Sequence, residues 1–279
     1  MTGGSALTAN GLGRRYGRRT WGLRDCTLEL PAGRVIGLVG GNGAGKTTLL
    51  HLAAGLLEPT EGRVSTFGLA EVGFVAQDCP LYRGFTVHDM LRFGRAMNRR
   101  FDLAGARQRL DGLGIPLDRR CGALSGGQQA QVALTLALAK RPRLLILDEP
   151  VASLDPLARR EVMRTLVDAV AATELTVLLS SHVVAELERV CDHLVLLDRG
   201  RLRLAGDIDD LLAGHRLLTG PRSDAAAGLP AVIAATHGDR HSTLLVRQPS
   251  GTPPHPLWQA SAVSLEEVVL AYLSAAGEG

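Results

Sequence analysis

Residues 34–39 read RVIGLV and residues 40–47 read GGNGAGKT, and this stretch decides the fold. The first six residues are mostly apolar and β-branched, which predicts a short buried strand. The next eight fit the pattern G-x-x-x-x-G-K-[ST], whose glycines let backbone N–H groups turn inward around phosphates. The segment Lys46 to Leu57 is rich in Leu, Ala and Thr and predicts a helix that Pro59 ends. Strand, glycine loop and helix in this order predict a parallel α/β unit with a phosphate-binding loop.

The end of this loop carries the groups that suit a nucleotide. We expect the Lys46 ammonium to meet the β- and γ-phosphates and the Thr47 hydroxyl to bind Mg²⁺. Of the 31 basic residues only two are lysines, and a compact ammonium is not interchangeable with a guanidinium. The residues expected to hold the nucleotide here are Gly40, Gly41, Asn42, Gly43, Ala44, Gly45, Lys46, Thr47 and Thr48.

A second apolar run, Leu144–Leu147, predicts a buried strand that ends in Asp148 and Glu149. The carboxyl end of a parallel strand lies beside the phosphate loop, so Asp148 is expected in the Mg²⁺ shell. Glu149 is suited to polarise an attacking water as a general base. A third run, Thr176–Leu179, predicts another buried strand, which ends near His182.

Helical patterns lie between and after these strands, at 126–140, 157–172 and 183–191. Apolar strands that alternate with helices favour a mostly parallel sheet covered on both faces. Residues 80–124 lack a strong strand signal and carry periodic apolar residues, which predicts a helical insertion. Asp198-Arg199-Gly200 predicts a hairpin turn.

The composition changes near residue 220 and predicts a small appended unit. Residues 223–230 are rich in Ala, Gly and Pro and look like a linker. Two strand-like runs follow at 231–236 and 242–247, and Ser264 with Glu267 forms a capping-box pattern before an apolar helix. We therefore expect a main domain over residues 1–218 and a small α+β extension over 219–279.

Residues 124–128 read LSGGQ, the most discriminating pentapeptide in the chain. Ser125 is suited to be the N-cap of a helix, and Gly126 and Gly127 allow close approach to its N-terminus. This pattern predicts a second anion site. Two phosphate-type sites and one nucleotide loop suggest that two protomers share their nucleotides.

Taken together, the chain resembles an ATP-binding cassette (ABC) ATPase over roughly residues 5–215. The resemblance rests on the phosphate loop, the LSGGQ signature, Asp148-Glu149, the Ser153-Leu154-Asp155 segment and His182, in this order and spacing. It implies a P-loop NTPase fold, with a RecA-like mostly parallel sheet and antiparallel β and α-helical subdomains.

The resemblance also implies cofactors and residue roles. ATP and Mg²⁺ are expected, and two cassettes pack head to tail, so that Ser125 and Gly127 contact the γ-phosphate held by the other chain. Tyr16 matches the aromatic residue that stacks on adenine, and Asp155 aligns the interface. The implied catalytic residues are Lys46, Gln77, Glu149 and His182; the implied metal ligands are Thr47, Gln77 and Asp148; and the implied signature contacts are Ser125, Gly126, Gly127 and Gln128.

Two positions depart from the family pattern. Gly41 stands where many members carry proline, and Gln131 replaces an arginine that is common just after the signature. The first change should be tolerated, because glycine reaches the needed backbone angles. The second removes any salt bridge that this arginine would form.

Composition limits the class of protein. With 279 residues, 46% hydrophobic and 21% charged, the chain can bury a sizeable core. A net charge of +3 is too balanced to indicate a nucleic-acid binder, and four distant cysteines indicate neither disulfides nor a zinc ribbon. We see no signal peptide and no apolar run of the ~20 residues that span a bilayer.

We therefore expect a cytoplasmic ATPase subunit, peripheral on the inner face of the plasma membrane, that drives a separate integral-membrane permease. The natural docking surface is the helical insertion, around Leu81, Tyr82, Phe85 and Met90. The tail resembles those of bacterial exporter-type cassettes for multidrug or antibiotic efflux, which favours export.

Three alternatives stay open. The chain could be an importer ATPase. It could be a non-transport cassette that acts on ribosomes or nucleic acid, although such proteins usually carry two cassettes or a long coiled coil. It could also be a regulatory module that binds ATP without turnover, which the presence of Glu149 and His182 disfavours.

Overall fold

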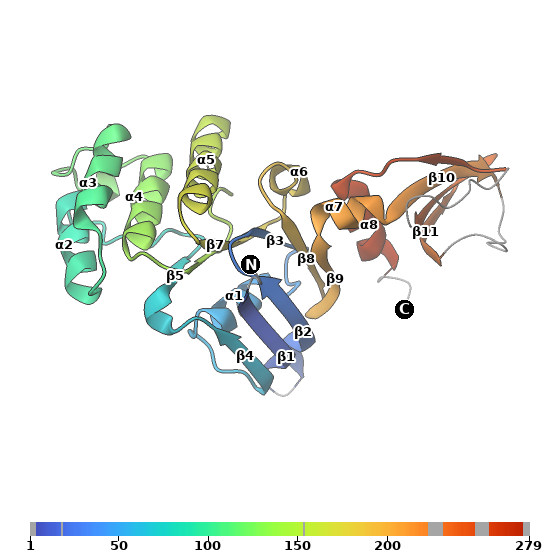
Figure 1. The fold of residues 1–279 in the computed structure, drawn as a ribbon, viewed down its shortest axis with the longest axis horizontal. Helices are drawn as coiled ribbons and strands as arrows, with labels where there is room; N and C mark the ends of the chain where they lie inside the picture. The colour runs from blue at the N-terminus through green and yellow to red at the C-terminus, as the bar shows by residue number, and fades with distance from the viewer. Residues whose placement is uncertain (1–3, 18, 153, 223–230, 249–256, 276–279) are drawn as a thin grey trace.

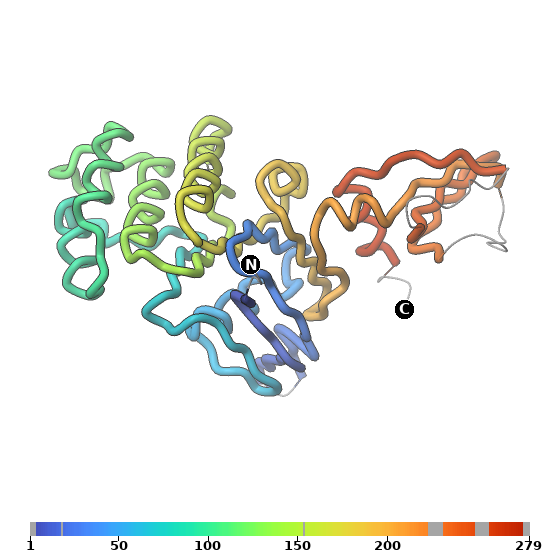
Figure 2. The backbone as a smooth tube through the Cα atoms, in the orientation of Figure 1, coloured from blue at the N-terminus to red at the C-terminus, as the bar shows by residue number. Residues whose placement is uncertain are grey.

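The computed structural model describes residues 4–17, 19–152, 154–222, 231–248 and 257–275. Three sheets are arranged along an elongated molecule, with helices α2–α5 at one end and the C-terminal sheet at the other (Figure 1). The backbone trace in Figure 2 shows how the chain returns to the centre between these two ends.

The central sheet has six strands in the order β5-β6-β7-β3-β8-β9. The first five are parallel, and β9 joins β8 as an antiparallel hairpin. The strands are β3 (Val35–Val39), β5 (Val72–Val75), β6 (Leu144–Leu147), β7 (Thr176–Ser181), β8 (His193–Asp198) and β9 (Arg201–Asp207). This sheet is the mostly parallel sheet that the sequence predicts, and it brings the loops after β3, β5, β6 and β7 to one edge.

Both faces of the central sheet are covered, which explains why its strands are continuously apolar. On one face, Ile36, Leu38 and Ile146 pack with α1 and the N-terminal sheet. On the other face, Leu145 and Leu179 pack with the longer helices. The helices around the sheet are α1 (Lys46–Ala53), α4 (Gly126–Ala139), α5 (Pro156–Ala172), α6 (Val184–Leu187) and α7 (Ile208–Ala213).

An antiparallel sheet in the order β2-β1-β4 lies against the phosphate-loop side of the molecule (Figure 1). Its strands are β1 (Ser5–Tyr16), β2 (Thr20–Pro31) and β4 (Glu61–Thr66). The single-turn helix η1 (Leu69–Glu71) connects β4 to β5. Strands β1 and β2 of this antiparallel sheet have 12 residues each, although the sequence pattern predicted no individual strand in residues 5–31.

The predicted insertion at 80–124 contains α2 (Val87–Met97), α3 (Leu103–Gly112) and the single turn η2 (Cys121–Ala123). Its own core of Val87, Leu91 and Leu110 joins α4 through Val132. Helix α2 begins with a capping box in which Thr86 and Asp89 bind each other's backbone N–H groups. Helix α4 belongs to two cores. Its Val132 packs in the core of the insertion, and its Ala133 and Leu134 pack under the central sheet.

The C-terminal unit is a four-stranded sheet in the order β11-β12-β10-β13, covered on one face by α8 (Leu265–Ala275). Its strands are β10 (His215–Pro221), β11 (Ala231–His237), β12 (His241–Arg247) and β13 (Gln259–Ser261). The predicted boundary between residues 218 and 219 falls inside β10, so this sheet begins earlier, at His215. The predicted linker at 223–230 lies outside the described residues.

Two predicted helices are shorter in the structure. Helix α1 ends at Ala53, because Gly55 takes a left-handed conformation with φ 69° that stops the helix before Leu57. The predicted helix at 183–191 contains only the single helical turn of α6, and β8 begins soon after it at His193.

Candidate functional site: a phosphate loop at the edge of the central sheet

The phosphate loop owes its shape to two glycines with no room for a side chain. A Cβ at Gly40 would lie 2.4 Å from the carbonyl oxygen of Leu197. A Cβ at Gly45, which caps α1 with φ 102°, would lie 2.4 Å from the carbonyl oxygen of Gly22. In contrast, a Cβ at Gly41 would meet nothing within 4 Å. The absence of proline at Gly41 therefore leaves the packing of the loop unchanged.

Lys46 lies inside this loop, and its side chain is buried. Its Nζ donates to the carbonyl oxygens of Gly40 at 2.8 Å and Gly41 at 3.3 Å, and it lies 3.6 Å from Glu149 Oε1. The ammonium is thus held where the loop turns, by partners that a phosphate oxygen can replace.

The loop after β6 brings the two predicted carboxylates to the same edge. The backbone N–H of Asp148 donates to the carbonyl oxygen of Val75 on β5 at 3.0 Å. Asp148 is buried, with 4% of the residue exposed, and its Oδ1 accepts a hydrogen bond from Ser180 Oγ at 2.7 Å. Its Oδ2 has no hydrogen-bond partner among the described residues, so one oxygen is free for a cation.

Ser180 links the two carboxylate residues. It is fully buried on β7, and its Oγ accepts from the Glu149 backbone N–H at 2.8 Å while donating to Asp148. Glu149 has φ 44°, an uncommon conformation for a non-glycine residue, and the Ser180 bond helps to hold it. The sequence analysis did not single out Ser180; the polar pair that ends an otherwise apolar strand was the available signal.

His182 follows β7 and faces the same carboxylate. Its Nδ1 lies 3.0 Å from Glu149 Oε2, and its side chain is half-exposed. The Glu149 side chain, 12% exposed, is therefore held between Lys46 on one oxygen and His182 on the other. Four predicted residues, Lys46, Asp148, Glu149 and His182, thus meet at the carboxyl edge of the central sheet.

Tyr16, at the end of β1, lies against Thr48 of α1. The Tyr16 ring is 43% exposed, and its hydroxyl lies 3.4 Å from Thr48 Oγ1. A Cβ at Gly22 would lie 2.5 Å from the Tyr16 ring and 2.8 Å from Thr48 Oγ1. Gly22 is a second residue that the sequence analysis missed, because its importance comes only from packing between β2, the ring and α1.

Two predicted metal-site residues are exposed at this edge. Thr47 lies on the first turn of α1, and Gln77 follows β5, two residues after the Val75 carbonyl that binds Asp148. Neither side chain forms a hydrogen bond within the described part of the chain. Both side chains are therefore available to bind a ligand, and so is Asp148 Oδ2.

The signature turn is built differently. Ser125 Oγ accepts from the Gln128 N–H at 3.2 Å, and Gln128 Oε1 accepts from the Ser125 N–H at 3.1 Å, which is a capping box at the start of α4. Gly127 is close to α5, since a Cβ there would lie 3.0 Å from Ala158 Cβ. Across the described residues, no hydrogen bond or ion pair connects this turn to the phosphate loop of the same chain.

Asp155 likewise serves its own helix. Its Oδ1 accepts from the N–H groups of Leu157 at 2.9 Å and Ala158 at 3.0 Å, so it is the N-cap of α5. Ser153 lies outside the described residues. The structure therefore places Asp155 and the signature turn at the neighbouring N-termini of α5 and α4.

These observations define a class: a P-loop NTPase fold whose sheet edge carries a lysine, two carboxylates and a histidine. Comparison with known proteins then gives the family. The model of the ABC transporter family matches residues 23–152, and that of an AAA domain matches residues 121–188.

Three curated relatives are similar over most of the chain. The molybdenum import ATP-binding proteins ModC of Aromatoleum aromaticum and ModC 1 of Azotobacter vinelandii are 36% and 33% identical. These matches cover 84% and 81% of this chain, and 66% and 68% of those proteins. The sulfate/thiosulfate import ATP-binding protein CysA of Yersinia pseudotuberculosis is 34% identical over 74% of this chain and 61% of that protein. The chain thus spans about two thirds of the length of these relatives.

Solved structures agree with this fold. An ATP-binding subunit of an ABC transporter superposes with a TM-score of 0.67 at 29% identity, over 74% of this chain and 92% of that one. A bacterial Atm1-family ABC exporter with ATP bound gives 0.64 at 27% identity, over 74% of this chain and 39% of that one. The chain therefore belongs to the ATP-binding proteins of ABC transporters, a family of ATPases, and the predicted fold class is confirmed.

Proposed function

We propose that this chain binds and hydrolyses ATP and that the energy drives import through separate membrane subunits. The observation that carries the proposal is the meeting of Lys46, Asp148, Glu149 and His182 at one sheet edge. The single-chain site supplies a phosphate-binding ammonium, a free carboxylate oxygen for a cation and a carboxylate base, which are the parts that phosphoryl transfer to water needs.

The residues divide this work by position. Lys46 exchanges its bonds to the loop carbonyls for the β- and γ-phosphates, which also frees Glu149 from its 3.6 Å ion pair. Glu149 then accepts a proton from the attacking water, and His182, 3.0 Å away, orients that carboxylate. Thr47, Asp148 and Gln77 fit a Mg²⁺ site, because all three offer oxygen ligands. Bound Mg²⁺ would neutralise charge on the phosphates.

We propose a head-to-tail pair of identical chains as the active form. The Ser125–Gln128 turn and Asp155 lie at helix N-termini that favour an anion, yet they do not contact the phosphate loop of their own chain. A second copy brings its nucleotide to this turn and completes the site. Hydrolysis then depends on closure of the pair.

The partner in the membrane is proposed to dock on the helical insertion. A groove of about 560 Å³ lies between the insertion and the sheet, lined by Leu81, Phe93 and Met90 among others. The rings of Tyr82, Phe85 and Phe93 cluster beside it, with centroid distances of 5.1 and 5.7 Å, and all three are exposed. Of the four residues predicted for this surface, Met90 is 6% exposed and only lines the groove. In the described residues, no helix is long and apolar enough to cross a membrane.

The direction of transport is proposed from the relatives, and it changes the sequence-based expectation. The tail favoured an exporter, but the three relatives are named for import of molybdenum or of sulfate and thiosulfate. The fold does not decide the direction, because the Atm1-family exporter also superposes on this chain, with a TM-score of 0.64. Import, one of the alternatives kept open by the sequence, is therefore the better-supported direction.

The experiment that tests this function uses Glu149→Gln. We expect the wild-type chain to hydrolyse MgATP. The variant should bind MgATP, but its rate of hydrolysis should be lower by a factor of at least about 100. The tagged variant, extracted from host membranes with ATP, should co-purify with a polytopic membrane protein. Deletion of the gene for this membrane protein should reduce uptake of radioactive sulfate or of a radioactive molybdenum salt. Increased retention of a toxic cargo on deletion would instead support export, and recovery with ribosomes would contradict the transport proposal.

A further inference from the structure

Arg109 on α3 is a charged side chain that forms no ion pair with a carboxylate among the described residues. Its guanidinium crosses α4 and reaches α5. Nε donates to Thr135 Oγ1 at 3.1 Å, and Nη2 donates to both Gln131 Oε1 at 3.2 Å and Thr165 Oγ1 at 2.8 Å. The carboxylate that acts on it electrostatically, Asp168, is paired with Arg164 instead. Three neutral acceptors on two helices therefore hold this charge.

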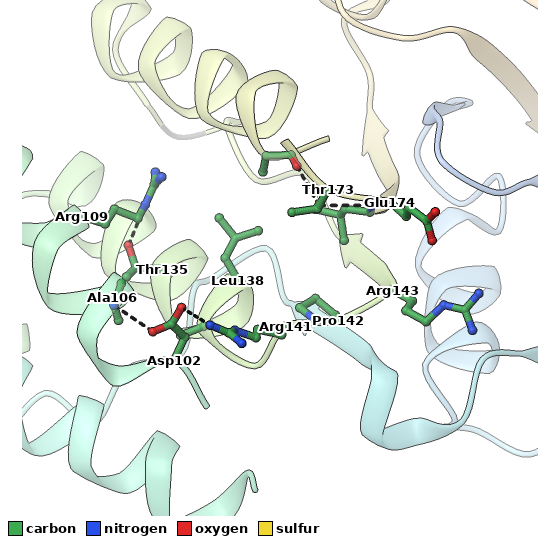
Figure 3. A pocket seen from close by; sticks show the side chains of 14 residues that line it. Asp102, Ala106, Arg109, Thr135, Leu138, Arg141, Pro142, Arg143, Thr173 and Glu174 are labelled. Carbon is green, nitrogen blue, oxygen red and sulfur yellow. Dashed lines mark hydrogen bonds and ion pairs between the residues drawn. The ribbon is translucent and has the colours of Figure 1, made fainter. Parts of the chain in front are cut away.

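The surroundings of Arg109 make this arrangement demanding. Burial lowers the pKa of its guanidinium, since the charged form is partly removed from water. Gln131 is buried, and its Nε2 has no hydrogen-bond partner in the described structure, so Arg109 is the sole partner of that side chain. Arg109 lies at one end of a groove of about 710 Å³ between α3, α4 and α5 (Figure 3).

The two helices that Arg109 bridges begin with the two outward-facing elements of the site. Helix α4 begins with the signature turn at Ser125, and α5 begins with Asp155. Their first turns already approach each other at Gly127 and Ala158. Arg109 supplies a second contact about two turns further along, at Thr135 and Thr165. The two helices lie next to each other (Figure 1), and the Arg109 bridge adds a polar contact to the apolar packing that α4 and α5 share in the central core.

We propose that Arg109 is a positioning residue that holds the signature turn and Asp155 as one rigid unit, so that both reach the ATP of a second copy together. This inference rests on the proposed function, because it needs an ATP shared between two chains. It also explains the loss of the common arginine at Gln131: the guanidinium now comes from α3, and the glutamine receives it.

The test removes the bridge to α5 with the smallest possible change. Thr165→Val keeps the shape of the side chain and deletes only the acceptor of the 2.8 Å bond. Arg109→Leu removes all three bonds and is the stronger variant. Arg141→Leu is the matched control, because Arg141 forms an exposed ion pair with Asp102 at 2.8 Å beside the same groove, and among the described residues no hydrogen bond or ion pair joins it to α5.

Four measurements follow for each variant: kcat, KM, affinity of the separate chain for a fluorescent ATP analogue, and the ATP concentration that dimerises the chain in a Glu149→Gln background. We expect both bridge variants to lower kcat about 10-fold and to raise the dimerising ATP concentration about 10-fold. Binding of the analogue, which uses the chain's own phosphate loop, should stay within twofold. The control should change none of these values by more than twofold.

Each outcome decides between the two proposals. If wild-type chain shows no ATP hydrolysis and no ATP-dependent dimer, the proposed function fails. If wild type hydrolyses ATP and dimerises but Thr165→Val and Arg109→Leu match it, only the role of Arg109 is overturned. If Arg109→Leu does not fold, Thr165→Val alone decides. Loss of analogue binding in Thr165→Val would show a general structural role and would also overturn the inference.

Discussion

Polar side chains at the phosphate-loop edge bind residues far away in the sequence, whereas those at the signature turn bind residues of their own helices. At the phosphate-loop edge, Lys46, Glu149 and His182 come from positions far apart in the chain and bind one another. At the signature turn, Ser125 and Asp155 bind N–H groups of their own helices, within three residues. Folding of one chain therefore assembles the first region, whereas the second is formed locally and faces outward.

In the proposed head-to-tail pair, this difference assigns the contribution of the second chain to the signature turn. A region whose groups already face each other can bind nucleotide alone. The polar groups of the signature turn only cap their own helices, so this turn contributes to nucleotide binding only when a phosphate from another chain reaches it.

The largest effect should come from Lys46→Met. The variant removes the buried ammonium that the loop carbonyls hold, and we expect loss of at least about 100-fold in ATP hydrolysis together with loss of ATP binding. Fluorescent-nucleotide binding and phosphate release measure both. Retained binding with normal affinity would contradict the assignment of the phosphate loop.

A mixture of variants sharpens the comparison. Ser125→Glu puts a carboxylate where a phosphate from a second copy should arrive, and we expect it to reduce hydrolysis strongly while leaving nucleotide binding intact. Mixed with Lys46→Met, it should recover activity, because one site of the mixed pair combines an intact phosphate loop with an intact signature turn. The measurement is hydrolysis as a function of mixing ratio. A mixture as inactive as either variant alone would argue against a shared site.

Ser180→Ala should have the next largest effect. It removes the hydroxyl that donates to Asp148 and accepts from the Glu149 N–H, which leaves a partly buried N–H unpaired. We expect kcat to fall about 10-fold to 100-fold and unfolding free energy to fall by about 1–3 kcal/mol. Steady-state kinetics and urea unfolding check this, and Ser180→Thr is the control that keeps the hydroxyl.

Gly22→Ala should weaken nucleotide binding more moderately. Its Cβ would clash with the Tyr16 ring and with Thr48, so one of them must move. We expect about 10-fold weaker binding with a cost of about 1–3 kcal/mol in stability. Gly41→Ala, which meets no neighbour, is the matched control and should bind normally. Equal effects of the two changes would contradict this account of the packing.

The smallest effect should be that of Asp155→Asn. Asparagine caps a helix as well as aspartate does, so the unfolding free energy should not change. Any change in ATP hydrolysis is then due to loss of the negative charge at position 155. We expect a loss of about threefold or less. Asp155→Ala should in addition lower the unfolding free energy by about 1 kcal/mol, which thermal or urea unfolding can measure.

Sequence alone predicted those parts that depend on local pattern. The strand Leu144–Leu147 has the same bounds in the structure, and Ser264 with Glu267 forms the predicted capping box. These features are set by a few adjacent residues, so a single sequence reveals them. The signature turn belongs to the same group, since its capping box is contained in four residues.

What sequence could not predict depends on packing between distant segments. Ser180 matters because β6 and β7 are neighbours, and Gly22 matters because β2 passes over α1. Arg109 reaches residues 22, 26 and 56 positions away. Met90 looked like a surface residue, but the fold of the insertion buries it.

The two lysines have a consequence for labelling chemistry. Lys46 is buried in the phosphate loop, and Lys140 donates its Nζ to the carbonyl oxygens of Leu69 and Val72. Burial lowers the pKa of Lys140, which raises the fraction of neutral, nucleophilic amine at neutral pH. An acylating reagent thus meets two side-chain amines of different accessibility: Lys46 in the nucleotide loop, where it is 6% exposed, and Lys140 beside Val72, the first residue of β5, at the other edge of the central sheet. The ratio of label on the two lysines becomes an internal gauge of nucleotide occupancy, with no reporter group attached to the protein.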